Sequence, residues 1–162
     1  MEDSGRYEVA QICFNGHVIT SMLESNPEMD QKFCGKCGAG TITECQSCKE
    51  KIRGYHIVSG ILSLSPYVLP KFCYACGKSY PWTESKLRAA QELTDELGEL
   101  TSKEREDLKK SLDEIVKDTP NAQVAAMRFK KLVAKAGRGA AEAFKEILIS
   151  IVSEAVKKSI WQ

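Results

Sequence analysis

The sequence predicts an α+β protein in two parts: a small cysteine-rich part with short β-hairpins over residues 1–82, then a bundle of about four α-helices over residues 83–162. All seven cysteines lie in the first part, most of them in closely spaced pairs. After residue 82, cysteine is absent and apolar residues recur at steps of three and four, the period of an amphipathic helix. A chain of 162 residues suits one ordinary domain or two small ones.

The cysteines lie in four short motifs between residues 13 and 76, each with two potential metal ligands, and we call these motifs half-sites. The first half-site in the sequence is Cys13-Phe-Asn-Gly-His17, and the other three are Cys-x-x-Cys pairs. A two-residue spacer lets both sulfurs of a tight turn reach one tetrahedral ion. Together the half-sites supply the ligands for two four-coordinate sites with none left over: Cys13, His17, Cys34, Cys37, Cys45, Cys48, Cys73 and Cys76. We therefore predict a double zinc ribbon with two structural Zn²⁺ ions.

Other roles for these thiols fit less well. A disulfide framework would need an even number of cysteines and an exported chain, whereas the count is seven and the N-terminus MEDSGRYEV carries no signal peptide. A redox Cys-x-x-Cys would lie in a βαβ context, which the pattern lacks. Iron is the alternative metal, because four thiolates also suit it.

His17 is the predicted eighth ligand because it lies four residues from Cys13, across an Asn-Gly turn. His56 is the alternative, although no other ligand neighbours it in sequence. Three groupings of the half-sites are open: sequential (first with second, third with fourth), cross-brace (first with third, second with fourth) and nested (the two central pairs together). We favour the sequential grouping because residues 18–32 and 49–72 are each long enough for one β-hairpin.

Short strands are predicted around the half-sites. Residues 7–13 enter the first half-site, residues 18–20 return from it, and residues 41–43 lie between the central pairs. Residues 24–32 predict a loop. In the insert before the last pair, Leu62 and Leu64 alternate with Ser63 and Ser65 as the residues of a half-buried strand do.

The helical part begins after Trp82, which we expect to fill the boundary between the two parts. Three helix starts are predicted from capping residues: Thr83, the capping box Thr101 to Glu104, and Thr119 followed by Pro120. Gly137 and Gly139 predict the end of the third helix. The last helix is predicted over about residues 140–160, where an apolar stripe is broad and continuous.

Several phrases of the first part occur together in a known family. They are Cys13-x-Asn-Gly-His17, Phe33-Cys-x-x-Cys-Gly, Thr43-x-Cys45-x-x-Cys48, Ile52-Arg-Gly54 and Phe72-Cys-x-x-Cys-Gly-x-x-Tyr80-Pro-Trp-Thr83. With these phrases the chain resembles a bacterial family of unknown function with zinc-ribbon features. The resemblance covers residues 7–84 specifically, and it implies metal binding in a bacterial cytosol.

Charge limits the classes of partner. The formal net charge is +1, so the chain as a whole is no polycation that would bind nucleic acid unspecifically. Two local groups of basic residues are the candidate partner-binding sites: Lys36, Lys49, Lys51 and Arg53 near the half-sites, and Arg128, Lys131, Lys135 and Arg138, whose spacing places them on one face of the predicted third helix. A solvated helix face is the alternative for the second group.

The sequence offers no catalytic constellation. A catalytic zinc keeps an open coordination position, whereas eight ligands close both predicted sites. We therefore predict a non-enzymatic, zinc-binding adaptor that holds a protein partner in the cytoplasm without a membrane anchor. The alternative is a nucleic-acid-binding zinc ribbon that uses the two basic groups. The broad apolar helix faces also permit a homodimer.

Overall fold

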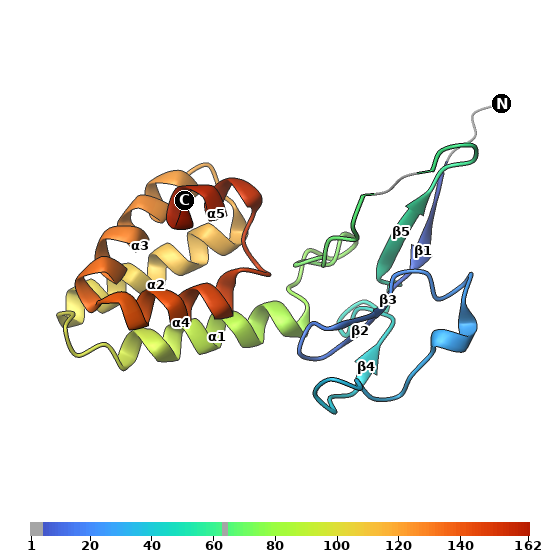
Figure 1. Cartoon of the computed structure of the whole chain (residues 1–162), viewed down its shortest axis with the longest axis horizontal. Helices are drawn as coiled ribbons and strands as arrows, with labels where there is room; N and C mark the ends of the chain where they lie inside the picture. Colours follow the sequence, from blue (N-terminus) through green and yellow to red (C-terminus); the bar gives the residue numbers. More distant parts are fainter. Residues whose placement is uncertain (1–4, 63–64) are drawn as a thin grey trace. The chain divides into compact units, whose positions relative to one another are not determined.

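The computed structural model describes residues 5–62 and 65–162. The chain divides between Thr83 and Glu84 into two compact units, here called the ribbon unit (1–83) and the helical unit (84–162) (Figure 1). Short antiparallel strands fill the first unit and helices the second, so the predicted α+β class is confirmed. Within the described ranges, every helix is too short or too polar to traverse a lipid bilayer.

Two small sheets make up the ribbon unit. Strand β2 (Gln11–Cys13) lies between β3 (Val18–Thr20) and β4 (Thr41–Ile42), antiparallel to both. Strand β1 (Arg6–Val9) pairs with β5 (Arg53–Ile57), also antiparallel. A 3₁₀ turn, η1 (Pro27–Met29), lies in the predicted loop. The predicted strand over residues 7–13 is thus two strands in different sheets.

The ribbon unit has a small core centred on Trp82. This side chain is fully buried and stacks on Tyr80 with 4.8 Å between ring centroids. Its indole N–H donates to the carbonyl of Pro70 at 2.8 Å, so its polar atom is satisfied. The other core members are Ala10, Ile12, Ile42, Ile52, Cys45 and Cys73, with Tyr67 and Leu69 packed against them. Two predicted metal ligands therefore belong to the hydrophobic core itself.

The insert before the last half-site differs from its prediction. Of the strand predicted over residues 62–65, Ser63 and Leu64 lie outside the described residues. Leu62 and Ser65 are in no strand, and the side chain of Leu62 is 96% exposed, like that of its neighbour Ile61 at 65%. The strand is β5 instead, and it needs Gly54, where a Cβ atom would lie 2.2 Å from the carbonyl oxygen of Ser21. The pattern of apolar residues in the sequence does not indicate this close approach of two backbone segments, so it could not predict β5.

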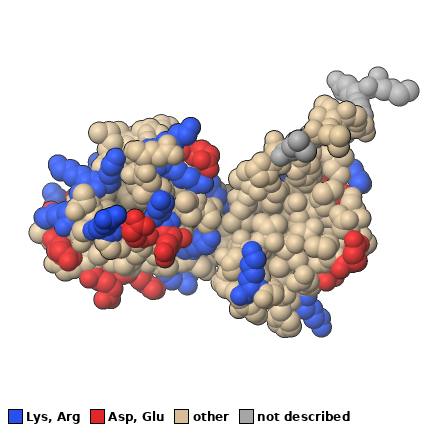
Figure 2. All heavy atoms as spheres, viewed as in Figure 1, with Lys and Arg blue, Asp and Glu red and all other residues tan. Residues whose placement is uncertain are grey.

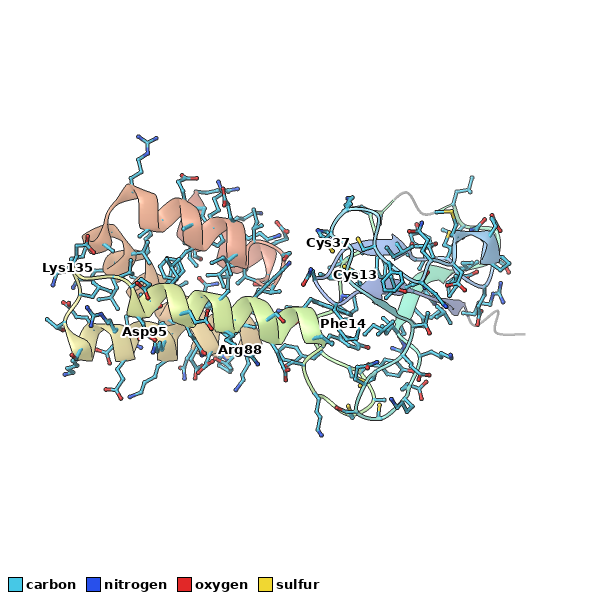
Figure 3. All side chains as sticks on the ribbon, turned by 90° about the horizontal axis from the view of Figure 1, so that it is seen from below. Cys13, Phe14, Cys37, Arg88, Asp95 and Lys135 are labelled. Atoms are coloured by element: carbon cyan, nitrogen blue, oxygen red, sulfur yellow. The ribbon has the colours of Figure 1, made fainter. Side chains whose placement is uncertain are left out.

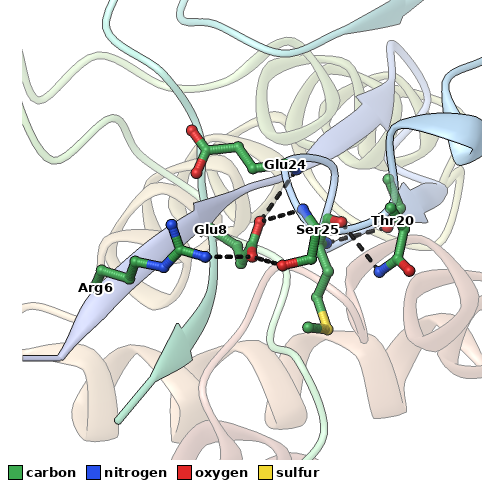
Figure 4. Close-up of polar contacts among 7 residues, drawn as sticks. Arg6, Glu8, Thr20, Glu24 and Ser25 are labelled. Carbon is green, nitrogen blue, oxygen red and sulfur yellow. Dashed lines mark hydrogen bonds and ion pairs between the residues drawn. The ribbon is translucent and has the colours of Figure 1, made fainter. Parts of the chain in front are cut away.

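Two buried polar side chains, Gln11 and Glu8, form hydrogen bonds with the loop that precedes the second half-site. The amide of Gln11 donates to Asp30, to the carbonyl of Gln31 and to Thr41, at 2.8–3.0 Å, and it accepts from the N–H of Gln31 at 3.1 Å. The carboxylate of Glu8 accepts hydrogen bonds from Glu24 and Ser25 (Figure 4). Both side chains are satisfied by donors or acceptors sixteen or more residues away in sequence.

Residues 81–162, all of them described, form five α-helices rather than about four. They are α1 (Pro81–Asp95), α2 (Ser102–Lys117), α3 (Ala122–Ala136), α4 (Arg138–Leu148) and α5 (Glu154–Trp161). Their shared core includes Leu108, Leu112 and Ile115 of α2. Phe129 of α3 meets Phe144 of α4 edge to face, with 5.3 Å between ring centroids. Burial of these large side chains holds the helices together.

The predicted last helix is two helices. Residues 149–153 form a turn between α4 and α5, and the hydroxyl of Ser153 caps α5 by accepting the N–H of Val156 at 3.3 Å. Ile151 and Val152 in this turn are buried, so the apolar stripe continues through the break without helical backbone. A continuous stripe therefore predicted a continuous helix, and the prediction was wrong.

The predicted helix starts have mixed outcomes. The capping box is confirmed: the Thr101 hydroxyl accepts from the N–H of Glu104, whose carboxylate accepts from the N–H of Thr101. The other two caps are wrong. The Thr119 hydroxyl donates a hydrogen bond to Glu114 and does not cap a helix. Thr83 lies inside a helix that already begins at Pro81, and its hydroxyl donates to the carbonyl of Lys71. Of the predicted stop, Gly137 is confirmed, because it has φ +103° and ends α3. Gly139 is wrong, because it lies within α4.

An ion pair gives α2 a pH-dependent link to α3. The ammonium of Lys135 lies 2.7 Å from Glu104, and this contact, followed by the N–H of Thr101, lowers the pKa of Glu104. A lowered pKa means that the ionised form favours the folded state. The resulting stability is present above the ordinary glutamate pKa of about 4.3 and is lost as the pH falls through the lower folded-state pKa.

We expect Glu104→Gln to lower the melting temperature of the helical unit at pH 7 and to have a smaller effect below pH 4. Glutamine keeps the capping acceptor, so the difference isolates the charge. Melting followed through the helical circular dichroism signal at both pH values measures it. Glu106→Gln, an exposed neighbour on the same helix, is the control. An equal loss at both pH values would show that the charge is not responsible.

Candidate metal centres

The three Cys-x-x-Cys turns share one backbone design. In each, the first cysteine N–H donates to the carbonyl five residues later, and its carbonyl accepts from the N–H four residues later: Cys34 with Ala39 and Gly38, Cys45 with Glu50 and Lys49, Cys73 with Lys78 and Gly77, all at 2.8–2.9 Å. A β-bridge closes each turn: Phe33 to Gly40, Glu44 to Lys51 and Phe72 to Ser79. The first sulfur of each pair is buried and the second exposed.

The residue after each second cysteine has a left-handed backbone. Gly38 and Gly77 have φ values of +74° and +75°, and Lys49 occupies the equivalent position with φ +64°. An L side chain rarely adopts this conformation, because its Cβ atom approaches the following carbonyl oxygen. Nothing lies within 4 Å of a Cβ added to Gly77, so the cost there is purely conformational.

We expect Lys49→Gly to stabilise the ribbon unit by about 0.5–1 kcal/mol, and Gly77→Lys to destabilise it by about 1 kcal/mol. The two substitutions exchange the same residue types at equivalent positions, so each is the other's control. Denaturant unfolding followed through Trp82 fluorescence, in a Trp161→Phe background, measures both. Shifts in the same direction would contradict the explanation.

The first group joins the first two half-sites. The Cys13 sulfur lies 3.5 Å from His17 Nδ1 and 3.8 Å from the Cys37 sulfur, and Cys34 lies 3.6 Å from His17 Nδ1. Cys13 and Cys37 lie close together in Figure 3. The Asn-Gly turn that brings His17 back is closed by Gly16, whose φ is +90° and whose N–H donates to the Cys13 carbonyl at 2.9 Å.

The second group joins the last two half-sites. The Cys45 sulfur lies 3.7 Å from Cys76, and the Cys48 sulfur lies 3.6 Å from Cys73. In both groups the four ligand atoms lie within 4.8 Å of one another. All seven cysteines are free thiols. Thus the structure has the sequential grouping of half-sites.

The distances fit a tetrahedral ion. A metal about 2.3 Å from two thiolates at tetrahedral angles separates the sulfurs by about 3.8 Å, and a ligating imidazole nitrogen lies about 3.5 Å from each sulfur. The observed separations are 3.6–3.8 Å between sulfurs and 3.5–3.6 Å between sulfur and nitrogen. A disulfide would require about 2.05 Å. Each group can therefore bind one metal ion.

Local N–H groups favour the thiolate form that binds a metal. The N–H of Ala39, and then the side-chain amide of Asn15, lower the pKa of the Cys37 thiol to about 6. The N–H of Cys48 lowers the pKa of Cys45 in the same way. Burial has the opposite effect at Cys13, whose pKa is raised. Hydrogen bonds to the charged form thus favour the thiolate at Cys37 and Cys45, whereas burial and the neighbouring thiols raise the pKa of Cys48.

His56 lies in neither group. It is on β5, where its ring lies 4.5 Å from that of Tyr7. His17 is the histidine that the structure brings to the sulfurs, and its Nδ1 atom faces two of them. The alternative eighth ligand is therefore not supported by the geometry.

The basic residues of the ribbon unit have different surroundings. Lys36 and Lys49 are exposed, whereas Lys51 lies 3.8 Å from the carboxylate of Glu44. The Arg53 guanidinium lies over two rings, 4.4 Å from the centroid of Tyr7 and 3.7 Å from that of Tyr74. Stacking of this kind holds Arg53 in place as a structural cation.

The second basic group is not one helix face. Arg128, Lys131 and Lys135 are exposed on α3, and Figure 3 labels Lys135. Arg138 follows Gly137 and is the first residue of α4, so its predicted place on the third helix was wrong. Lys135 is engaged by Glu104, as described above.

Sequence reasoning missed two contributors to the centres. Asn15, predicted only as part of a turn, donates its amide to the Cys37 sulfur at 3.4 Å. Tyr74, between the ligands of the last pair, donates its hydroxyl to Glu50 at 2.7 Å and lies under Arg53. Asn15 has a detectable signal, because it lies between two ligands only four residues apart. The bond from Tyr74 spans 24 residues and has none.

Residues 6–160 match a family described as an uncharacterized protein conserved in bacteria (DUF2321). The chain belongs to this family. The match spans both units, so the helical unit is as much a part of the family as the ribbon unit. No curated protein and no solved structure matches the chain. The resemblance predicted from the cysteine phrases is confirmed.

Proposed function

We propose that each group holds one structural zinc ion, and that the chain is a non-enzymatic adaptor whose zinc-ordered ribbon unit holds a protein partner. The observation that carries the proposal is that four protein ligands converge on each centre at tetrahedral spacing. A catalytic zinc normally has three protein ligands and a water or substrate in the fourth position. Four protein ligands leave no coordination position for a substrate.

Zinc suits both donor sets better than the other metals. Three thiolates with one imidazole, and four thiolates, are the usual ligands of structural zinc. Four thiolates also suit iron, but the histidine in the first group favours zinc there. A bound zinc ion would fix segments whose own core is small. Seven free thiols also favour a reducing cytoplasm as the place of work.

The ribbon surface suits a protein partner. Phe33, beside the second half-site, is 65% exposed, and Phe14 and Tyr74 are also exposed next to ligands. The visible face of the ribbon unit in Figure 2 is mostly uncharged. Residues 1–83 contain eight basic and eight acidic residues, so the unit offers no net positive charge to phosphates. Exposed aromatic side chains are frequent anchors at protein interfaces.

Nucleic acid is the second candidate partner. One observation favours it: residues 119–141 contain five basic and no acidic residues. Phosphate contacts by such residues would make binding fall steeply with salt. An adaptor that holds its partner through aromatic side chains would depend far less on salt.

The first experiment measures metal content and nucleic-acid absorbance on the same purified sample. We expect two zinc ions per chain and no nucleic acid. One zinc ion or none in folded protein would overturn the structural sites, and iron in either centre would overturn the assignment of zinc.

The second experiment introduces a photo-crosslinking phenylalanine analogue at Phe33 in the living bacterium, with Glu99 in the helical unit as the control position. We expect a protein adduct of defined mass from Phe33 and none from Glu99. A nuclease-sensitive adduct would favour the second candidate. The absence of any adduct would overturn the role of the ribbon surface.

A further inference from the structure

Helix α3 has an unusual distribution of charge. Residues 119–141 carry five basic side chains and no acidic one, whereas residues 84–118 carry seven basic and eleven acidic ones. The excess of positive charge is therefore confined to α3 and the first turn of α4. Arg128 and Lys131 are exposed there, and no ion pair engages either of them within the described residues.

Apolar side chains lie among these cations. Val124 is 58% exposed and Met127 is 71% exposed, although both are on a helix whose opposite face is buried. Residues three, four and seven positions apart on a helix lie on one face, so Val124, Met127, Arg128 and Lys131 form one continuous surface. We call these four residues the α3 face. Adjoining exposed apolar side chains with polar residues at their rim are frequent at protein interfaces.

A groove runs beside the α3 face. It measures about 560 Å³ and lies between α2 and α3. Val124 and Arg128 line one wall, and Lys110, Asp113, Glu114 and Lys117 line the other. The acidic groups of the groove have partners: Asp113 accepts from Gln91 at 3.5 Å, and Glu114 accepts from Thr119. Among the described residues, neither Lys110 nor Lys117 forms an ion pair, so the cations are the groups left to bind.

We propose that the α3 face docks an acidic amphipathic helix of a partner protein. Apolar residues of that helix cover Val124 and Met127, and its carboxylates pair with Arg128 and Lys131. A helix presents residues at the same three- and four-residue spacing as the α3 face, so the two patterns match along their length. Charge complementarity selects the acidic partner and speeds its association.

Nucleic acid fits this face less well than a helix does. A phosphate backbone gains little from Val124 and Met127, which lie among the cations. It would also run past Asp113 and Glu114, whose carboxylates line the groove and repel a continuous polyanion. The carboxylates of a partner helix, by contrast, can be confined to the positions that face the cations. The proposal goes beyond the ribbon-unit function above, and it rests on helical-unit residues alone.

The test uses the full-length, metal-loaded chain and fluorescence anisotropy. The probe is a labelled 18-residue helical peptide with Leu at positions i, i+4 and i+7 and Glu on both flanks of that stripe. A peptide of the same composition with its Leu residues scattered, and an 18-nucleotide single strand of DNA, are the comparison probes. We expect binding of the first peptide at least about tenfold tighter than that of either comparison probe.

Variants connect this binding to the α3 face. We expect Arg128→Glu with Lys131→Glu to weaken binding of the peptide at least about tenfold, and Met127→Ser to weaken it about fivefold. All three side chains are exposed, so these variants should fold normally, which a circular dichroism spectrum verifies. Lys103→Glu, an exposed cation on α2, is the matched control and should leave binding unchanged.

Three outcomes would overturn the proposal: no binding of the helical peptide at millimolar protein, equal binding of the scattered peptide, or tighter binding of DNA that the same variants abolish. A Cys48→Ser chain tested in parallel separates this proposal from the zinc-ordered function. Its helical unit keeps the α3 face, so peptide binding should persist even where the ribbon unit has lost its metal.

Discussion

Replacing Cys73 with serine is expected to unfold the ribbon unit and to leave the helical unit folded. Cys73 is buried, belongs to the hydrophobic core of the ribbon unit and lies 3.6 Å from the Cys48 sulfur. Structural zinc supplies an apparent binding free energy of about 10–16 kcal/mol in small zinc-folded domains. That core is small and contains two of the ligands, Cys45 and Cys73, so it has little stability to replace the metal's contribution.

The measurement is a ¹H–¹⁵N correlation spectrum with zinc content determined on the same sample. We expect the variant to hold at most one zinc ion, to lose the dispersed signals of the ribbon unit and to keep those from residues 84–162. Ser47→Ala changes the exposed residue between Cys45 and Cys48, and it should hold two zinc ions. A metal-free chain that retained every ribbon-unit signal would contradict a structural role for the ion.

Much of the metal site could be predicted because its signals are local. The spacing of Cys34 and Cys37, like that of the other two pairs, determines a turn with both sulfurs on one side. The grouping of half-sites was harder to predict, since it depends on hairpins that bring Cys13 next to Cys37, 24 residues away. Loop length favoured the sequential grouping, but only the structure shows which sulfurs meet.

The failures of prediction come from tertiary contacts. Thr119 and Thr83 are good capping residues in sequence, yet their hydroxyls bind Glu114 and Lys71 in the folded chain. Ser153 shows the opposite error. It caps α5, although the sequence predicted no cap there, because the apolar stripe continues through the turn at Ile151. Local propensity is a weak prior that such contacts override.

Glu8 is the clearest example of a residue that sequence patterns misplace. It lies between the apolar residues Tyr7 and Val9, where strand alternation predicts an exposed polar side chain, yet it is 1% exposed. Its carboxylate accepts the N–H of Glu24 at 3.1 Å, the N–H of Ser25 at 3.3 Å and the hydroxyl of Ser25 (Figure 4). The guanidinium of Arg6 lies 3.6 Å away but is largely exposed, so the donors of the loop satisfy most of the buried charge.

We expect Glu8→Ala to destabilise the ribbon unit by about 2–4 kcal/mol, because it removes the acceptor of three hydrogen bonds and leaves a cavity. Glu8→Gln should cost nearly as much, since an amide NH₂ group would then face donors. Glu24→Ala is the control, because the Glu24 side chain is exposed and only its backbone N–H takes part. Urea unfolding followed through Trp82 fluorescence, in a Trp161→Phe background, measures all three.

The effect of Glu8→Ala on metal retention at the two centres distinguishes a specific role of Glu8 from a general loss of stability. Glu8 holds residues 24–25, and Gln11 holds residues 30–31, so the two together fix the segment that delivers Cys34 to the first centre. Loss of Glu8 should therefore weaken metal retention at the first centre more than at the second. Competition with a chelator, followed by zinc release over time, would show one fast and one slow ion. Equal acceleration of both ions would mean that Glu8 supports the ribbon unit as a whole and does not specifically position Cys34.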